Sequence, residues 1–113
     1  MKFVFDIDDT ICTSESKDGE HKDYKDAKPI VSRIQAINKL WNEGHSITFF
    51  TARGMGRYDG DVHQVYANFY EFTFDQLTSW GVHFDRLIMG KPSADIYVDD
   101  KGISDKEYFN EKS

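Results

Sequence analysis

The first ten residues place the tightest constraint on how this chain can fold. The apolar residues at positions 3–5 and 7 include the aromatic and β-branched side chains that favour a buried strand. Asp6 and Asp8 are two residues apart, and on a strand this spacing points both side chains to the same side. Two carboxylates aimed at one point repel each other unless a hard divalent cation lies between them. The stretch therefore predicts a metal site at the carboxyl end of a central strand.

Strand and helix patterns alternate along the rest of the chain. We expect further strands over 45–51, 84–89 and 96–98, and helices from Pro29 to Gly44 and over 62–80. This order is typical of a mainly parallel sheet joined by crossover helices. The prediction is an α/β fold, a Rossmann-like three-layer sandwich with a mainly parallel central sheet. A length of 113 residues fits a single domain over 1–113 and leaves no room for a cap domain.

Polar side chains follow each expected strand at the point where the strand ends. They are Asp6 and Asp8, then Thr51 and Arg53, then Lys91, then Asp99 and Asp100. Because parallel strands end at one edge of a sheet, we expect these groups to converge on one cleft.

In this order the motifs resemble those of the haloacid dehalogenase (HAD) superfamily of phosphohydrolases, over nearly the whole chain. The matching segments are Asp6-Ile7-Asp8-Asp9-Thr10, Phe49-Phe50-Thr51-Ala52-Arg53, Gly90-Lys91-Pro92 and Tyr97-Val98-Asp99-Asp100. A single Asp-x-Asp is weak evidence, whereas four motifs in order are strong evidence. The surrounding residues look like small capless members linked to capsule or lipopolysaccharide biosynthesis.

The resemblance implies a Mg²⁺-dependent phosphatase that works through an aspartyl-phosphate. Asp6 would be the nucleophile. Asp8 would protonate the leaving oxygen and later deprotonate the water, which requires a raised pKa. The ion would be held by the Asp6 side chain, the Asp8 backbone carbonyl and Asp99.

The remaining motif residues would bind the phosphoryl group or shape the site. Thr51 would hydrogen-bond a phosphoryl oxygen, and Lys91 would offset the negative charge of phosphate and nucleophile. Asp100 would support the metal or pair with Lys91. Asp9 and Thr10 would shape the turn beside the substrate.

Each of these residues also has an ordinary structural explanation. The acidic run at Asp6 could form a strand-end turn, and Thr51 could cap a helix. Lys91 could be a turn lysine, and Asp99 with Asp100 a solvated loop. Arg53 could contact substrate or form a surface ion pair.

The segment 13–28 has no apolar period. It is either a cover for the site or a solvated linker.

Three other functions fit parts of the pattern. A phosphorelay receiver domain also uses clustered acids, Mg²⁺, a threonine and a lysine, but its phosphorylated aspartate ends the third strand. A phosphotransferase on the same scaffold is disfavoured by Asp8, which suits hydrolysis. A catalytically silent binding module is disfavoured by the complete set of acids and Lys91.

Charge and cysteine content restrict location and partners. The net charge of −6 argues against binding to nucleic acid or to an anionic membrane surface. A lone cysteine, Cys12, and no expected signal peptide or membrane span indicate a cytoplasmic protein. The resemblance to the HAD superfamily implies a small phosphorylated substrate, a sugar or polyol phosphate of surface-polysaccharide synthesis. The open site suggests that a loop or a second subunit closes it, so a homo-oligomer is possible.

Overall fold

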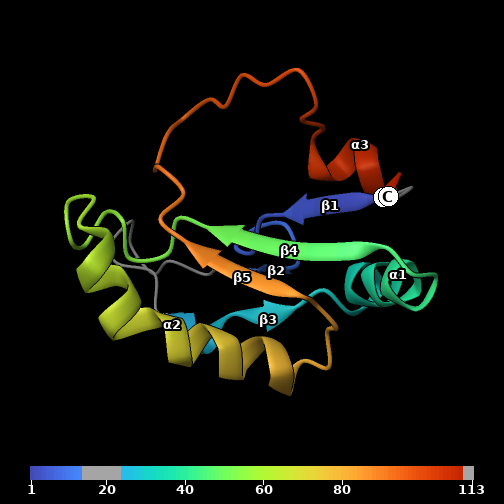
Figure 1. Cartoon of the computed structure of the whole chain (residues 1–113), viewed down its shortest axis with the longest axis horizontal. Coiled ribbons are helices and arrows are strands. Elements are labelled where there is room, and N and C mark those ends of the chain that lie inside the picture. The colour runs from blue at the N-terminus through green and yellow to red at the C-terminus, as the bar shows by residue number, and fades with distance from the viewer. Residues whose placement is uncertain (14–23, 111–113) are drawn as a thin grey trace.

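A parallel three-stranded sheet lies at the centre of the fold in the computed structural model, which describes residues 1–13 and 24–110 (Figure 1). Its strands are β1 (Lys2–Phe5), β4 (Ser46–Thr51) and β5 (Arg86–Met89), in the order β1-β4-β5. Both pairings are parallel, and Phe49 aligns with Phe5 on one side and with Leu87 on the other. The α/β class and the parallel sheet expected from the sequence are therefore confirmed.

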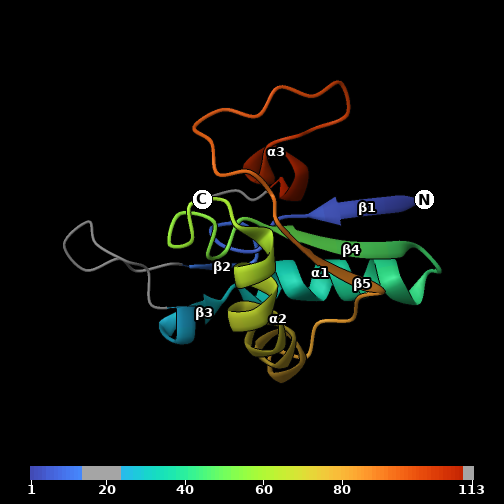
Figure 2. The same cartoon turned by 60° about the vertical axis from the view of Figure 1, so that its left-hand side comes forward.

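In the described residues three α-helices accompany the sheet, namely α1 (Val31–Asn42), α2 (Val62–Ser79) and α3 (Asp105–Phe109). Each successive strand is added on the same side of the previous one, so right-handed crossovers place α1 and α2 on one face. Figure 2 shows α1 and α2 below the strands of the sheet. The apolar residues of that face form the core with Ile34, Ile37, Val65 and Leu77 of the two helices. A short hairpin, β2 (Cys12–Thr13) with β3 (Lys28–Pro29), follows the first strand.

The two faces of the sheet are buried to different extents. On β4 the residues Ile47, Phe49 and Thr51 are buried and alternate with partly buried ones, as expected for a half-covered strand. On the opposite face Val4, Arg86 and Ile88 are exposed. The helices of the described residues thus cover one face of the sheet.

The expectation of a strand at 96–98 is wrong for the described part of the chain. Residues 90–104 form a loop without a strand between β5 and α3, and Val98 is 94% exposed. A β-favouring sequence forms a strand only when it pairs with a neighbouring strand, and in the described residues this segment pairs with none. The contacts of the loop are local instead: the Lys91 ammonium lies over the Tyr97 ring, and the Tyr97 hydroxyl donates to the Pro92 carbonyl.

The first helix begins later than the sequence suggests. Pro29 pairs with Cys12 in the hairpin, and the backbone N–H of Ile30 donates to the Ile11 carbonyl at 2.8 Å. These bonds hold the chain extended through Pro29, so α1 begins at Val31. None of the helices in the described residues has the length and apolar character of a membrane span.

Arg33 fastens α3 to the rest of the fold. From α1 its guanidinium donates to the Asp105 carboxylate at 2.6 Å and to the Thr10 carbonyl at 2.9 Å. It also lies 4.8 Å from the ring centre of Phe109. Partial burial opposes ionisation of Asp105, but the hydrogen bond and charge of Arg33 outweigh it and lower the pKa of this carboxyl. The C-terminal helix is therefore held by an ion pair and by aromatic contacts.

This ion pair predicts a pH-dependent stability difference. Because the folded pKa of Asp105 lies below its unfolded value, the stabilisation is present above about pH 4 and is lost as the pH falls through the folded pKa. We expect Asp105→Asn to lower the free energy of unfolding by about 1 kcal/mol at pH 7. In urea titrations, the difference in unfolding free energy between Asp105→Asn and wild type should be smaller at pH 3 than at pH 7. A difference of equal size at both pH values would contradict this prediction. Glu107→Gln on the same helix is the control.

Candidate functional site

A tight turn follows β1 and carries the first motif. The backbone N–H groups of Thr10 and Ile11 both donate to the Ile7 carbonyl, at 3.1 and 2.9 Å. Asp9 adopts the left-handed conformation with φ 64°, which aspartate tolerates better than most residues. The turn leaves Asp6 and Asp8 partly buried at the carboxyl end of the strand.

Asp6 lies between a lysine and a threonine. The Lys91 Nζ atom is 3.7 Å from Asp6 Oδ1, and the Thr10 hydroxyl donates to Asp6 Oδ2 at 3.5 Å. Lys91 is brought there by its backbone N–H, which donates to the Thr51 carbonyl at the end of β4. Burial raises the pKa of Asp6, and the positive charge of Lys91 acts in the opposite direction. The structure therefore places the first and third motifs in contact.

Asp8 is paired with Arg53, and this corrects the expectation for that arginine. Arg53 Nε donates to Asp8 Oδ2 and Arg53 Nη2 to Asp8 Oδ1, both at 3.0 Å. Arg53 is 1% exposed, so this is a buried ion pair and not the surface ion pair that the sequence left open, while contact of Arg53 with a substrate stays a prediction. Two parallel hydrogen bonds from one planar group fix the orientation of the carboxylate.

Arg53 also contacts Gln76, Tyr24 and Thr73, which the sequence did not single out, and we call these residues together the Arg53 cluster. Arg53 Nη1 donates to Gln76 Oε1 at 2.7 Å, and the guanidinium lies 4.8 Å from the ring centre of Tyr24. The Gln76 amide in turn donates to the Tyr24 carbonyl at 2.7 Å. For Gln76 the sequence offered one signal, a polar residue within the apolar stripe of a helix. No sequence pattern pointed to Tyr24.

Thr51 is buried, with 1% exposure, at the end of β4. Its hydroxyl accepts a hydrogen bond from the backbone N–H of Arg53 at 3.1 Å. In this arrangement Thr51 shapes the turn that carries Arg53.

Asp99 and Asp100 do not join the other acids. Both lie exposed in the loop after β5. The backbone N–H of Lys101 donates to Asp99 at 3.1 Å and lowers the pKa of that carboxyl, assisted by the Asp100 side chain. Across residues 1–13 and 24–110 no three acidic, histidine or cysteine side chains are grouped to hold a metal. Within one chain the expected Mg²⁺ ligand set is therefore incomplete, with Asp6 and Asp8 at the site and Asp99 outside it.

The neighbouring cysteine is unsuited to nucleophilic chemistry. Cys12 is fully buried, and burial followed by the charge of Asp8 raises the pKa of its thiol to about 12. At neutral pH it is a thiol rather than the reactive thiolate.

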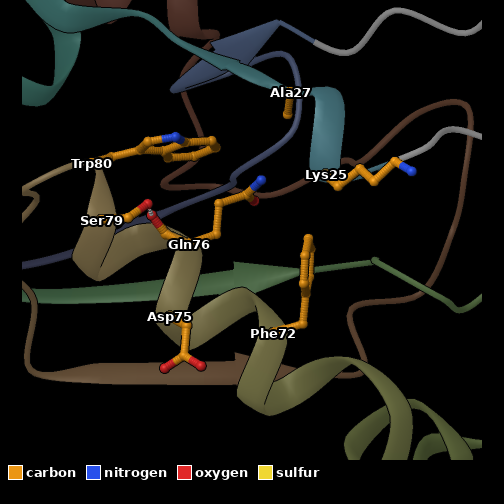
Figure 3. Close-up of a pocket in the computed structure, with 7 residues that line it drawn as sticks. All are labelled: Lys25, Ala27, Phe72, Asp75, Gln76, Ser79 and Trp80. Carbon is orange, nitrogen blue, oxygen red and sulfur yellow. Dashed lines mark hydrogen bonds between the residues drawn. The ribbon is translucent and has the colours of Figure 1, made fainter.

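A shallow hollow of about 370 Å³ lies beside the Arg53 cluster (Figure 3). The aromatic rings of Phe72 and Trp80 flank Gln76 there, with Lys25 and Asp75 also at its edge. Gln76 thus has one side toward the hollow and its amide group engaged by Arg53 and Tyr24. The segment proposed to cover the site, 13–28, lies partly outside the described residues.

Gly54 is required by the close packing behind the site. It has φ 78°, and a Cβ added there would lie 2.6 Å from a ring carbon of Phe69. We expect Gly54→Ala to lower the free energy of unfolding by about 2 kcal/mol or more, since it adds backbone strain to a clash. Thermal denaturation measures this. Gly56→Ala is the matched control because a Cβ there meets nothing within 4 Å. If Gly54→Ala were as stable as Gly56→Ala, Gly54 would not be required by its packing against Phe69.

Comparisons with known proteins extend to the fold only. The chain matches no family model and no curated protein. It is similar to the crystal structure of an MCSG target from Vibrio cholerae, with a TM-score of 0.84 and 24% identity over 98% of this chain and 89% of that one. This similarity shows that the α/β arrangement occurs in a solved structure.

Proposed function

We propose that this protein is a Mg²⁺-dependent phosphatase of the HAD type that hydrolyses a small phosphate monoester. The observation that carries the proposal is the contact of Lys91 with Asp6 at the carboxyl end of β1. A partly buried carboxylate with a cation beside it suits in-line attack on a phosphoryl group, since the cation offsets the charge of the incoming phosphate.

The proposed reaction has two steps. An Asp6 oxygen forms a bond to phosphorus while the ester P–O bond breaks, and the leaving oxygen takes a proton from Asp8. A water then attacks phosphorus and gives a proton to Asp8, and the Asp6–phosphorus bond breaks to release phosphate. When bound, Mg²⁺ would neutralise charge on the phosphoryl oxygens.

The Arg53 pair sets a condition on the role of Asp8. Both Asp8 oxygens accept a hydrogen bond from Arg53, at 3.0 Å each. Arg53 therefore fixes the orientation in which Asp8 would transfer a proton to the leaving oxygen.

The finer fold description belongs to the same proposal. In a Rossmann-like three-layer sandwich, helices would cover both faces of the sheet. The second face is the one that carries Val4 and Ile88, which are exposed in the described chain. The substrate class, a sugar or polyol phosphate, rests on the resemblance of the motifs.

A phosphate-release screen tests the proposal. Purified protein with Mg²⁺ is incubated with sugar, polyol, nucleotide and protein phosphates, each with and without a chelator. We expect release from sugar or polyol phosphates that the chelator abolishes. Absence of release from every class would refute the phosphatase, while stable labelling by acetyl phosphate without turnover would favour the receiver alternative.

A further inference from the structure

The guanidinium of Arg53 is held at two of its edges. At one edge Nε and Nη2 donate to the two Asp8 oxygens. At the other, Nη1 donates to Gln76 Oε1 at 2.7 Å and to the Thr73 hydroxyl at 3.4 Å. A planar group that is bonded along one edge only can swing about that edge. The shorter bond, to Gln76, therefore determines where the guanidinium lies.

Gln76 is itself held in one orientation. Its amide nitrogen donates to the Tyr24 carbonyl at 2.7 Å, while its amide oxygen accepts from Arg53. A rotated amide would set a donor against Arg53 and an acceptor against the Tyr24 carbonyl, so only the observed orientation satisfies both partners. Figure 3 shows the side chain directed from α2 toward the segment that carries Lys25 and Ala27. Gln76 thus joins that segment to Arg53.

Tyr24 completes a closed set of contacts around the arginine. Its ring centre lies 4.8 Å from the guanidinium carbon of Arg53. Its hydroxyl accepts from the backbone N–H of Gly54 at 3.1 Å, one residue beyond Arg53. Loss of the Gln76 amide would free the outer edge of the guanidinium and the Tyr24 carbonyl together.

Asp8 depends on Arg53 for its orientation. The other hydrogen-bond donor that the Asp8 side chain meets in the described residues is the Cys12 thiol, at 3.6 Å. A thiol is a weak donor, whereas the two bonds from Arg53 are charge-assisted. A displacement of the guanidinium would therefore turn or shift the Asp8 carboxyl group.

We propose that Gln76 is a positioning residue for proton transfer by Asp8. Gln76 holds the guanidinium of Arg53, and Arg53 holds the Asp8 carboxyl group toward the leaving oxygen of the ester. Gln76 is neither a donor nor an acceptor of that proton. The inference rests on the proposed function, in which Asp8 gives its proton to the leaving oxygen as the ester P–O bond breaks. Loss of Gln76 should therefore slow those esters whose leaving oxygen needs a proton.

The leaving group of the ester distinguishes positioning from a structural role. The leaving oxygen of an alkyl phosphate is strongly basic and needs a proton, whereas p-nitrophenolate can leave without one. Gln76→Met keeps a side chain of similar length and removes both hydrogen bonds. We expect it to lower kcat/KM by about tenfold or more for the alkyl phosphate that wild type hydrolyses fastest, and by no more than about twofold for p-nitrophenyl phosphate. Equal losses for the two esters, or no loss for the alkyl phosphate, overturn the proposal.

Two further variants calibrate this comparison. Asp8→Asn removes the proton donor and should show the same preference with a larger loss for the alkyl phosphate. An Asp8→Asn variant that slows both esters equally would refute the proton transfer and this proposal with it. Gln35→Met makes the matched change at an exposed position on α1 and should leave both values within about twofold of wild type. Circular dichroism checks folding, and Gln76→Leu takes the place of Gln76→Met if that variant does not fold.

Thermal denaturation tests the coupling without any measurement of activity. In the described residues Gln76 and Asp8 make no hydrogen bond to each other, and both bond to Arg53. We expect the thermal midpoint of the Gln76→Met, Asp8→Asn double variant to lie at least about 3 °C above the value obtained by adding the two single losses. Additive losses overturn the proposal. A wild type that releases no phosphate from any ester would refute the proposed function, whereas the midpoints would still decide whether Gln76 acts on Asp8.

Discussion

Replacing Asp6 by asparagine is expected to lower Mg²⁺-dependent phosphate release by at least about a thousandfold. The asparagine amide keeps the size of the side chain but removes the nucleophilic oxygen and the negative charge. Lys91, 3.7 Å from Asp6 Oδ1, would then face a neutral group. Initial rates of phosphate release at saturating substrate measure the effect.

A matched substitution separates chemistry from folding. Glu71→Gln likewise replaces a carboxylate by an amide, at an exposed position on α2 outside the site, and we expect it to leave the rate within about twofold of wild type. Thermal denaturation of both variants checks that they fold. An Asp6→Asn enzyme that retains full activity would remove Asp6 from the nucleophilic role.

Replacing Arg53 by methionine is expected to lower the free energy of unfolding by about 3–5 kcal/mol. The substitution keeps a long side chain but leaves the partly buried Asp8 carboxylate without its two hydrogen bonds, and it leaves Gln76 Oε1 without its donor. A drop in the thermal midpoint of more than about 10 °C follows for a domain of this size.

Two further variants identify the cause of that loss. Arg86→Met makes the same change on the exposed face of β5 and should cost no more than about 0.5 kcal/mol. Adding Asp8→Asn to Arg53→Met removes the uncompensated charge and should restore part of the stability. If Arg53→Met is as stable as Arg86→Met, the ion pair does not hold the site together.

The sequence predicted the parallel sheet because each buried strand is a short apolar run that can be recognised without knowing its neighbours in the sheet. Phe5, Phe49 and Leu87 lie in register on one face, as local apolar runs suggest. Lys91 reaches Asp6 because strand ends of a parallel sheet share one edge, which is a topological rule rather than a sequence detail.

The parts that the sequence did not predict depend on distant partners. Arg53 pairs with Asp8 across 45 residues, and no spacing rule relates the two. Residues 96–98 have a strand-forming sequence, but strand formation requires an available edge, and within one described chain that segment does not meet one. Pro29 suits the first turn of a helix, so the sequence predicts it there, whereas its pairing with Cys12 holds it extended.

The most direct test of the central claim is the chemical identity of residue 6 during turnover. Protein mixed with Mg²⁺ and an active phosphate monoester is quenched in acid and treated with borohydride, which reduces an aspartyl-phosphate to homoserine. Peptide mass spectrometry then locates the modified residue. We expect homoserine at position 6, enriched in Asp8→Asn if that variant slows dephosphorylation more than phosphorylation. Turnover of substrate with Asp6 unmodified, or with homoserine at another aspartate, would contradict it.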